Sequence, residues 1–187
     1  MHARLSRAQI ERALRAHRAR RYPIPGLRRA AVLIALFHAE PQDQTRLWLL
    51  RRPDDGTPHG GQVALPGGKR EPGEELGATA LREASEEIGL APEQVELIGV
   101  LDELITITRF RVTPYVGWIR GAFEPIPNPR EADRVFAVPL EAFAAEPEQH
   151  RVSLAGFSPR VDSTRIAGEL VWGATFRILR GLVSMVR

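Results

Sequence analysis

Three glutamates, Glu83, Glu86 and Glu87, stand at positions i, i+3 and i+4 of "REASEEIGL" (82–90). On a helix this spacing places their side chains within an arc of about 100°. Carboxylates at such spacings repel one another by roughly a few tenths of a kcal/mol per pair unless a cation lies between them. An all-oxygen set suits hard divalent ions such as Mg²⁺ or Mn²⁺. The triplet alone favours an ordinary solvated helix face, so its neighbours must decide between the two interpretations.

The residues around the triplet complete a longer pattern with fixed spacing. It reads Gly, five residues, Glu, seven residues, Arg-Glu, an apolar residue, any residue, Glu-Glu, any residue, Gly, apolar, with Ala84 as its weakest match. The specified positions are Gly68, Glu74, Arg82, Glu83, Glu86, Glu87, Gly89 and Leu90. This is the pattern of the Nudix box, and the sequence therefore resembles the Nudix hydrolases. The resemblance implies an α+β fold, a Nudix-type α/β/α sandwich with a mixed central sheet.

The resemblance also implies roles for particular residues. Glu83, Glu86 and Glu87 are expected to hold Mg²⁺ or Mn²⁺, and Glu74 with Arg82 is expected to form a structural ion pair. Gly67 and Gly68 lack a Cβ, so their backbone could approach a phosphate or a metal. The catalytic proton acceptor is left open between Glu83 or Glu86 on the helix and Glu131 in the later segment "NPREADRVF".

The substrate is indicated outside the box. The segment "HGGQVALPGG" (59–68), with Arg52 upstream, resembles the coenzyme A pyrophosphatase branch of the family. The implied reaction cleaves coenzyme A or acyl-CoA into 3′,5′-ADP and 4′-phosphopantetheine. The expected substrate- or phosphate-binding residues are Arg52, His59, Gln62, Gly67 and Gly68. His59 and Gln62 are equally explained as residues that stabilise the loop, and Leu65 departs from the phenylalanine usual in that branch.

Two alternatives stay open at this stage. The first is a Nudix pyrophosphatase for another substrate, such as ADP-ribose, NADH or a nucleoside triphosphate. Residues 106–108 (Thr-Ile-Thr) lack the proline or tyrosine that marks the ADP-ribose and dinucleoside polyphosphate branches. The second is a non-catalytic, nucleotide-sensing Nudix module; because such modules usually lose acids of the box and none is lost here, hydrolysis is favoured.

Periodicity predicts the elements that position these residues. Apolar runs predict strands over 28–37, 45–52, 62–65, 95–107 and 110–119, with Pro114 limiting pairing on one side of the last. A helix is predicted over 74–88 with Gly89 as its stop, and a strand with a short helix within 128–147. We expect a single domain over 1–187, with a basic N-terminal helix and linker (1–26), the Nudix box (68–90) and a C-terminal helix (172–187). Ser6 and Gln9 have the spacing of a capping box for the first helix.

Composition limits the function classes. The chain has 187 residues, is 43% hydrophobic and contains no cysteine, which excludes disulfides and thiolate metal sites. Its net charge of +3 hides nine arginines against one acid in residues 1–29, which leaves 17 − 22 = −5 for the remainder. The other arginines are scattered, and no apolar run approaches the roughly 20 residues that span a bilayer. We therefore expect a soluble, cytoplasmic protein with a small-molecule nucleotide substrate, without nucleic-acid or membrane partners; a homodimer is left open.

Overall fold

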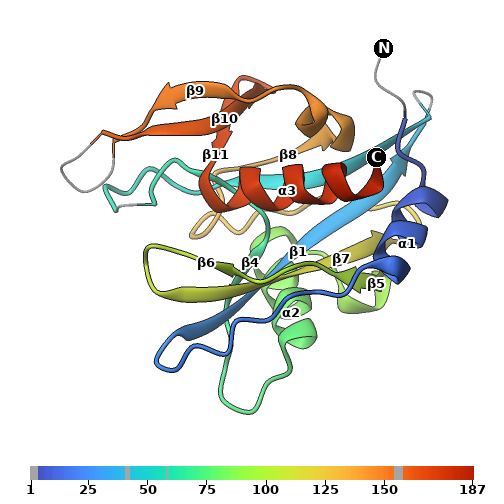
Figure 1. The fold of residues 1–187 in the computed structure, drawn as a ribbon, viewed down its shortest axis with the longest axis horizontal. Helices are drawn as coiled ribbons and strands as arrows, with labels where there is room; N and C mark the ends of the chain where they lie inside the picture. The colour runs from blue at the N-terminus through green and yellow to red at the C-terminus, as the bar shows by residue number, and fades with distance from the viewer. Residues whose placement is uncertain (1–3, 41–42, 58, 154–157) are drawn as a thin grey trace.

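The computed structural model describes residues 4–40, 43–57, 59–153 and 158–187. The chain forms an α+β fold in which helices cover both faces of a mixed sheet (Figure 1). Its helices are α1 (Arg7–Ala16), α2 (Leu76–Ile88) and α3 (Gly173–Val186). Its strands are β1 (Arg28–Ala39), β2 (Gln44–Arg51), β3 (Val63–Ala64), β4 (Gly67–Lys69), β5 (Val95–Val100), β6 (Leu104–Ile105), β7 (Phe110–Ile119), β8 (Arg134–Pro139), β9 (Glu148–Arg151), β10 (Arg160–Ile166) and β11 (Glu169–Trp172). Short 3₁₀ helices span Pro92–Gln94 and Leu140–Ala144.

The main sheet is built around β1. Its order is β3-β2-β1-β7-β5, with β4 paired to β1, β6 to β7 and β8 to β2. The β1–β7 pair is parallel, and the other pairs are antiparallel. The first half of β1 pairs with β4 and its second half pairs with β2, so the glycines of β4 lie where the neighbouring strand changes. A separate sheet has the order β11-β10-β9.

The side chains of β1 divide the core into two clusters. Ile34 and Leu36 pack with buried residues of α1 and α3, whereas Leu33 and Ala35 pack with the apolar face of α2. Alternate residues of a strand point to opposite faces, so a continuous apolar run is what a strand covered on both sides requires. Figure 1 shows α1 and α3 on one side of β1 and β7, with α2 on the other.

Pro114 interrupts pairing at one edge of the sheet, as the sequence predicts. Val112 pairs with Leu104 of β6 and Tyr115 pairs with Val100 of β5. Between these strands the N–H of Leu101 still donates to the Pro114 carbonyl (2.9 Å), while residues 102 and 103 have no ladder partner in β7. Proline has no backbone N–H to donate to a neighbouring strand. The side-chain carboxylates of Asp102 and Glu103 accept hydrogen bonds from the backbone N–H groups of Arg20 (2.8 Å) and Tyr22 (2.7 Å). The edge is thereby free to bind the linker between α1 and β1.

Several predicted boundaries differ from the structure. The box helix begins at Leu76, two residues later than predicted, and ends before Gly89, which has φ +74°. The predicted strand over 95–107 is divided into β5 and β6. The strand β4 and the β9–β11 sheet were not predicted. The predicted capping box of Ser6 and Gln9 is present at the start of α1.

Within the described ranges, none of the helices combines the length and apolar character needed to cross a membrane.

Candidate active site

The helix α2 places its carboxylates along the edge of its buried face. Ala80, Ala84 and Ile88 are fully buried against the sheet. Glu83 and Glu87, four residues apart, fall on a neighbouring stripe that faces β4. The backbone N–H of Gly89, in the left-handed conformation, caps the helix by bonding to the carbonyls of Ala84 and Ser85.

Three carboxylates converge in space. Glu83, Glu87 and Glu131 each offer one oxygen, and these oxygens all lie within 4.8 Å of one another. Glu131 comes from a loop more than 40 residues beyond α2, and that loop is attached to the end of the helix. The N–H of Asn128 donates to the carbonyl of Glu87 (2.9 Å), and the N–H of Glu131 donates to the carbonyl of Asn128 (2.9 Å). The arrangement supplies an all-oxygen donor set of the kind that Mg²⁺ and Mn²⁺ accept.

The glycines of β4 make room for these carboxylates. A Cβ on Gly68 would lie 2.5 Å from the Glu83 carboxyl carbon, which is closer than side chains tolerate. A Cβ on Gly67 would lie 2.4 Å from the carbonyl oxygen of Ala31, and Gly67 also has φ +153°. Gly67 is therefore required by the sheet, whereas Gly68 is required by the carboxylate.

Glu87 is the most deeply buried member of the cluster, with 1% of its surface exposed. One of its carboxylate oxygens accepts the N–H of Gly67 (2.8 Å), and the other lies 3.6 Å from the guanidinium of Arg52. Burial raises the pKa of Glu87 to about 8, opposed by the Gly67 hydrogen bond and by Arg52. Burial also raises the pKa of Glu83. A bound divalent cation would supply the positive charge that favours the ionised forms of both groups.

Glu74 and Arg82 form the ion pair that the sequence indicated. The guanidinium contacts both carboxylate oxygens, at 2.9 and 3.2 Å, and Thr79 donates to the same carboxylate at 2.7 Å. The Arg82 hydrogen bonds lower the pKa of Glu74 to about 2, and the same pair raises the pKa of Arg82. Because Arg82 also donates to the Lys69 carbonyl (3.2 Å), the pair attaches the box loop to both α2 and β4.

Glu86 does not join the three convergent carboxylates. Its side chain is 49% exposed and lies 3.0 Å from the Arg82 guanidinium. The structure thus brings together two of the three glutamates expected to bind metal, Glu83 and Glu87, and adds Glu131 as the third oxygen donor.

The remaining predicted residues lie in the loop between β2 and β3. The backbone of Arg52 pairs with this loop, donating to the Gln62 carbonyl (3.0 Å) and accepting from Gly61 (3.2 Å). Nδ1 of His59 lies 3.2 Å from Oε1 of Gln62, so these two side chains contact each other. Gln62 also lines a cavity of about 510 Å³ between this loop and the β9–β11 sheet. Trp172 of β11 also lines that cavity.

The chain matches the NUDIX domain family over residues 27–161. The fold and the glutamates around β4 place the protein in the Nudix class, and the chain belongs to this family.

Two groups of relatives illustrate the similarity. The chain is 37% identical over 173 residues to "Nudix hydrolase 22, chloroplastic" of Arabidopsis thaliana, covering 85% of this chain and 55% of the relative. It is 36% identical over 177 residues to "Uncharacterized Nudix hydrolase NudL" of Pectobacterium atrosepticum, covering 88% and 85% respectively. The chain thus spans about half the length of the plant relative and most of the bacterial one.

Solved structures agree on the fold. A MutT/nudix family protein from Enterococcus faecalis matches with a TM-score of 0.56 at 18% identity, over 97% of this chain and 70% of that chain. The Nudix hydrolase RenU from M. smegmatis matches with a TM-score of 0.54 at 26% identity, over 63% and 73%.

Proposed function

We propose that the protein is a metal-dependent Nudix pyrophosphohydrolase that cleaves the diphosphate bond of a nucleoside diphosphate derivative. The convergence of Glu83, Glu87 and Glu131 beside β4, in a chain of this family, carries the proposal. Mg²⁺ or Mn²⁺ held by these carboxylates would neutralise phosphate oxygens and lower the pKa of a bound water.

Residues of the chain would bind the substrate's phosphate and accept the proton of the attacking water. Gly68 leaves the Glu83 carboxylate accessible beside the backbone, and Arg52 supplies a positive charge next to the cluster. In the reaction a water oxygen bonds to one phosphorus, the bridging P–O bond breaks, and the departing phosphate keeps the bond's electron pair. Glu131 is our candidate to accept the water's proton, because it reaches the cluster from a loop and accepts only a long hydrogen bond of 3.5 Å from the Asn128 amide among the described side chains. Glu83 and Glu86 are the competing candidates on the helix.

Coenzyme A or its acyl derivatives are the proposed substrates. The support is the segment "HGGQVALPGG" together with Arg52. In the structure this loop runs from Arg52, whose side chain contacts Glu87, past the cavity lined by Gln62. A phosphate-bearing substrate at the cluster could therefore extend its second moiety along the loop.

A hydrolysis screen tests both levels of the proposal. Purified protein with Mg²⁺ or Mn²⁺ would be given coenzyme A, acetyl-CoA, dephospho-coenzyme A, ADP-ribose, NADH and nucleoside triphosphates, with Glu87→Gln as the matched inactive variant. We expect the highest kcat/KM with coenzyme A or acetyl-CoA and the release of 3′,5′-ADP. A clear preference for ADP-ribose would contradict the substrate and retain the reaction, whereas no metal-dependent hydrolysis of any compound would contradict the reaction itself.

A further inference from the structure

The loop that carries Glu131 is attached to the molecule on two sides. On one side it docks on α2, where the N–H of Asn128 donates to the Glu87 carbonyl. Next to Glu131, Ala132 is 1% exposed and packs in the core cluster under α2. On the other side the loop leads into β8, which pairs with β2. The position of the Glu131 carboxylate therefore depends on how both α2 and β2 hold the loop.

The contact with β2 is made by Arg51, the last residue of that strand. Its guanidinium donates from Nε (3.0 Å) and Nη2 (2.8 Å) to the two carboxylate oxygens of Asp133. The carbonyl of Arg51 also accepts the N–H of Asp133 at 3.0 Å. A two-point contact between a guanidinium and a carboxylate fixes direction as well as distance. Asp133 is thus held in place two residues from Glu131.

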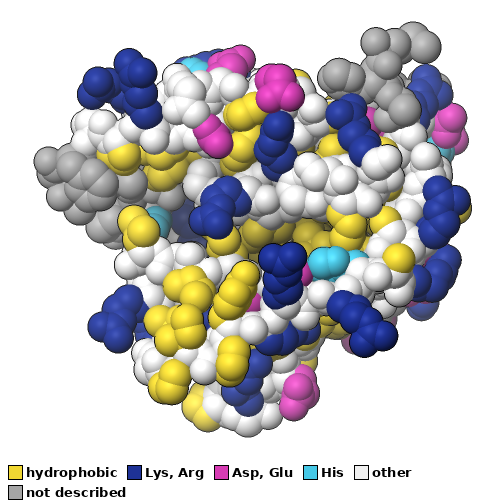
Figure 2. Space-filling model, viewed as in Figure 1, with side chains coloured by type: hydrophobic (Ala, Val, Ile, Leu, Met, Phe, Trp, Pro, Cys, Tyr) yellow, Lys and Arg dark blue, Asp and Glu magenta, His cyan; other side chains and the backbone are white. Residues whose placement is uncertain are grey.

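This contact differs from those of arginines that stand in solvent. Figure 2 shows several Lys and Arg side chains that project outward from the face carrying α3. Isolated ion pairs on such a surface contribute little, because water solvates both partners. Arg51 is 39% exposed, but besides its bidentate contact it lies 3.6 Å from the carboxylate of Glu169 in β11, which also accepts from Arg134 (2.7 Å). These side chains form a network that holds the Arg51 guanidinium from two sides.

The next residue along the chain contacts the other side of the metal site. Arg52 directly follows Arg51, and its guanidinium lies 3.6 Å from Glu87. The end of β2 therefore contacts a carboxylate of the helix through Arg52 and the loop of Glu131 through Arg51. Glu83 and Glu87 share one helix, whereas Glu131 must be brought to within 4.8 Å of them from another segment. Its distance from the helix carboxylates depends on the loop and on what anchors it.

We propose that Arg51 is a positioning residue, which holds the Glu131 carboxylate against Glu83 and Glu87 through its ion pair with Asp133. Arg51 acts through the backbone between residues 131 and 133, and not by contact with the metal or the substrate. The inference rests on the proposed function, because it concerns the same metal site. It adds a determinant of that site that lies outside the box and outside the three convergent glutamates.

Mn²⁺ binding to the full chain, followed by the EPR signal of free Mn²⁺, tests this role without substrate. We expect Arg51→Gln and Asp133→Asn each to weaken Mn²⁺ binding about tenfold, at the lower end of the roughly 10–100-fold loss typical for partners of metal ligands. The direction is diagnostic for Arg51, because removing a positive charge near three carboxylates would by itself strengthen cation binding. Arg134→Gln is the matched control: it removes an arginine of the same network that does not pair with Asp133, so the affinity should stay within about twofold of wild type.

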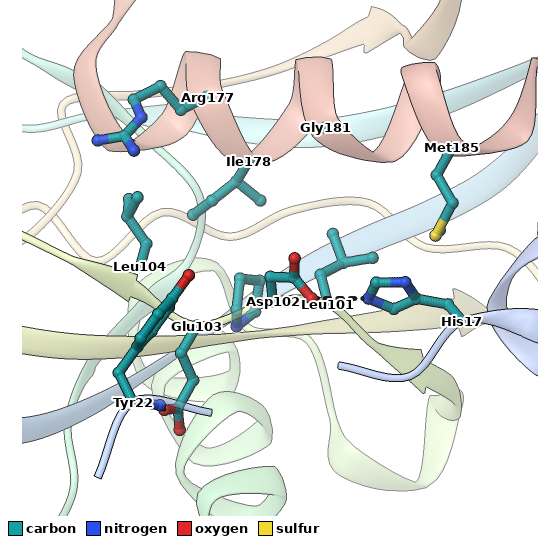
Figure 3. Close-up of a pocket in the computed structure, with 11 residues that line it drawn as sticks. His17, Tyr22, Leu101, Asp102, Glu103, Leu104, Arg177, Ile178, Gly181 and Met185 are labelled. Atoms are coloured by element: carbon teal, nitrogen blue, oxygen red, sulfur yellow. Dashed lines mark hydrogen bonds and ion pairs between the residues drawn. The ribbon is translucent and has the colours of Figure 1, made fainter. Parts of the chain in front are cut away.

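A second control tests for a general loosening of the fold. Asp102 accepts the N–H of Arg20 and lies 3.0 Å from Nε2 of His17, beside a cavity of about 400 Å³ between α3 and the sheet (Figure 3). Asp102→Asn makes the same chemical change as Asp133→Asn and should loosen the linker after α1. Its Mn²⁺ affinity should nevertheless stay within about twofold of wild type. An equal loss in Asp102→Asn would show that Mn²⁺ affinity follows stability, and would overturn the proposal.

The decisive measurement places Arg51→Gln in the Glu131→Gln protein. We expect Glu131→Gln alone to weaken Mn²⁺ binding and the second change to cause no further loss, because the carboxylate that Arg51 positions is already gone. Three results would overturn the proposal: unchanged or tighter Mn²⁺ binding in Arg51→Gln, unchanged binding in Glu131→Gln, or a further loss in the double variant.

Hydrolysis gives a separate measurement. At saturating Mn²⁺, Arg51→Gln should lower kcat about tenfold and change KM by less than about twofold, because the position of Glu131 affects the transition state and not the binding of substrate. The absence of hydrolysis in wild type, together with the expected Mn²⁺ affinities, would contradict the proposed function and support the positioning role. Failure of the Mn²⁺ cycle in an active enzyme would contradict the positioning role alone.

Discussion

The α2 side and the α3 side of the central sheet differ in how their polar groups are satisfied. Beside α2, the buried carboxylates of the box have partners within the protein: Glu74 pairs with Arg82, and Glu87 accepts a backbone N–H from β4. Beside α3, the linker uses the carboxylates, while Arg177 is left without a partner among the described residues. On the α2 side, the glycines of β4 lie in close contact with Glu83 and the β1 backbone, whereas on the α3 side Gly181 faces open space. Substitutions should therefore act through charge and fit in the first region, and through volume in the second.

The largest effect is expected from Glu87→Gln. This change removes a carboxylate charge at nearly constant shape, and the amide oxygen can still accept the Gly67 N–H. Metal-dependent kcat/KM should fall by at least about 100-fold. The melting temperature should not fall, because burial already disfavours the charged form. Unchanged activity at saturating Mg²⁺ would contradict the metal site.

Substitutions at the two glycines of β4 should have different effects, one mainly on activity and the other mainly on stability. Gly68→Ala brings a methyl group against the movable end of Glu83, so activity should fall by about tenfold or more while stability changes by less than about 1 kcal/mol. Gly67→Ala brings it against the β1 backbone and should cost more than about 2 kcal/mol in the free energy of unfolding. Kinetics and urea denaturation of the two variants measure both effects. Equal stability losses would refute the distinction.

Glu74→Gln should lower the free energy of unfolding by an intermediate amount that depends on pH. The pKa of Glu74 is lowered from 4.5 to about 2, so its contribution is fully present above about pH 4.5 and is lost as the pH falls toward 2. Near pH 7 the variant should be less stable by about 1.5–3 kcal/mol, the usual worth of hydrogen bonds to charged groups. The difference between the two proteins should shrink in acid. A constant difference from pH 7 to pH 2.5 would be inconsistent with the ion pair as its source.

The smallest effect is expected on the α3 side. Gly181→Ala should raise the free energy of unfolding by about 1 kcal/mol, because alanine restricts the unfolded chain and its methyl group meets open space. Thermal and urea denaturation would measure the gain, with Ser184→Ala on the same helix as the control for a change at an exposed site. Destabilisation by Gly181→Ala would mean that the helix has no room at this position.

The box could be predicted from the sequence because the spacing of its residues along one short segment determines where they lie. Fixed spacing on one helix places Glu83 and Glu87 on one stripe, and Gly89 ends that helix wherever the rest of the chain lies. The long strands β1 and β7 were predicted for a similar reason, because each is an apolar run covered on both faces. The family resemblance supplied the pairing of Glu74 with Arg82, which composition alone does not indicate.

The remainder depends on contacts between distant segments. β4 is "GGK", which has no strand propensity and is extended because it pairs with β1. β9 and β10 are too polar to be recognised, and they are strands because they pair with each other. The approach of Glu131 to the cluster follows from the docking of its loop on α2, and it is Glu131, not Glu86, that joins Glu83 and Glu87. The spacing of residues within one segment does not predict the positions of these strands or of the Glu131 loop.

The packing of α1 and α3 in one core cluster has a practical consequence for the choice of domain boundaries. The family match runs from residue 27 to residue 161, so it omits α1, Tyr22 and α3, and its end falls within β10. Ile10, Leu14, Leu179 and Leu182 from the omitted helices are buried in one core cluster with β1. A fragment trimmed to the matched range would expose that apolar surface to water and would retain the glutamates without the fold that supports them. For expression and for binding work, the useful unit extends from the first turn of α1 to the last turn of α3.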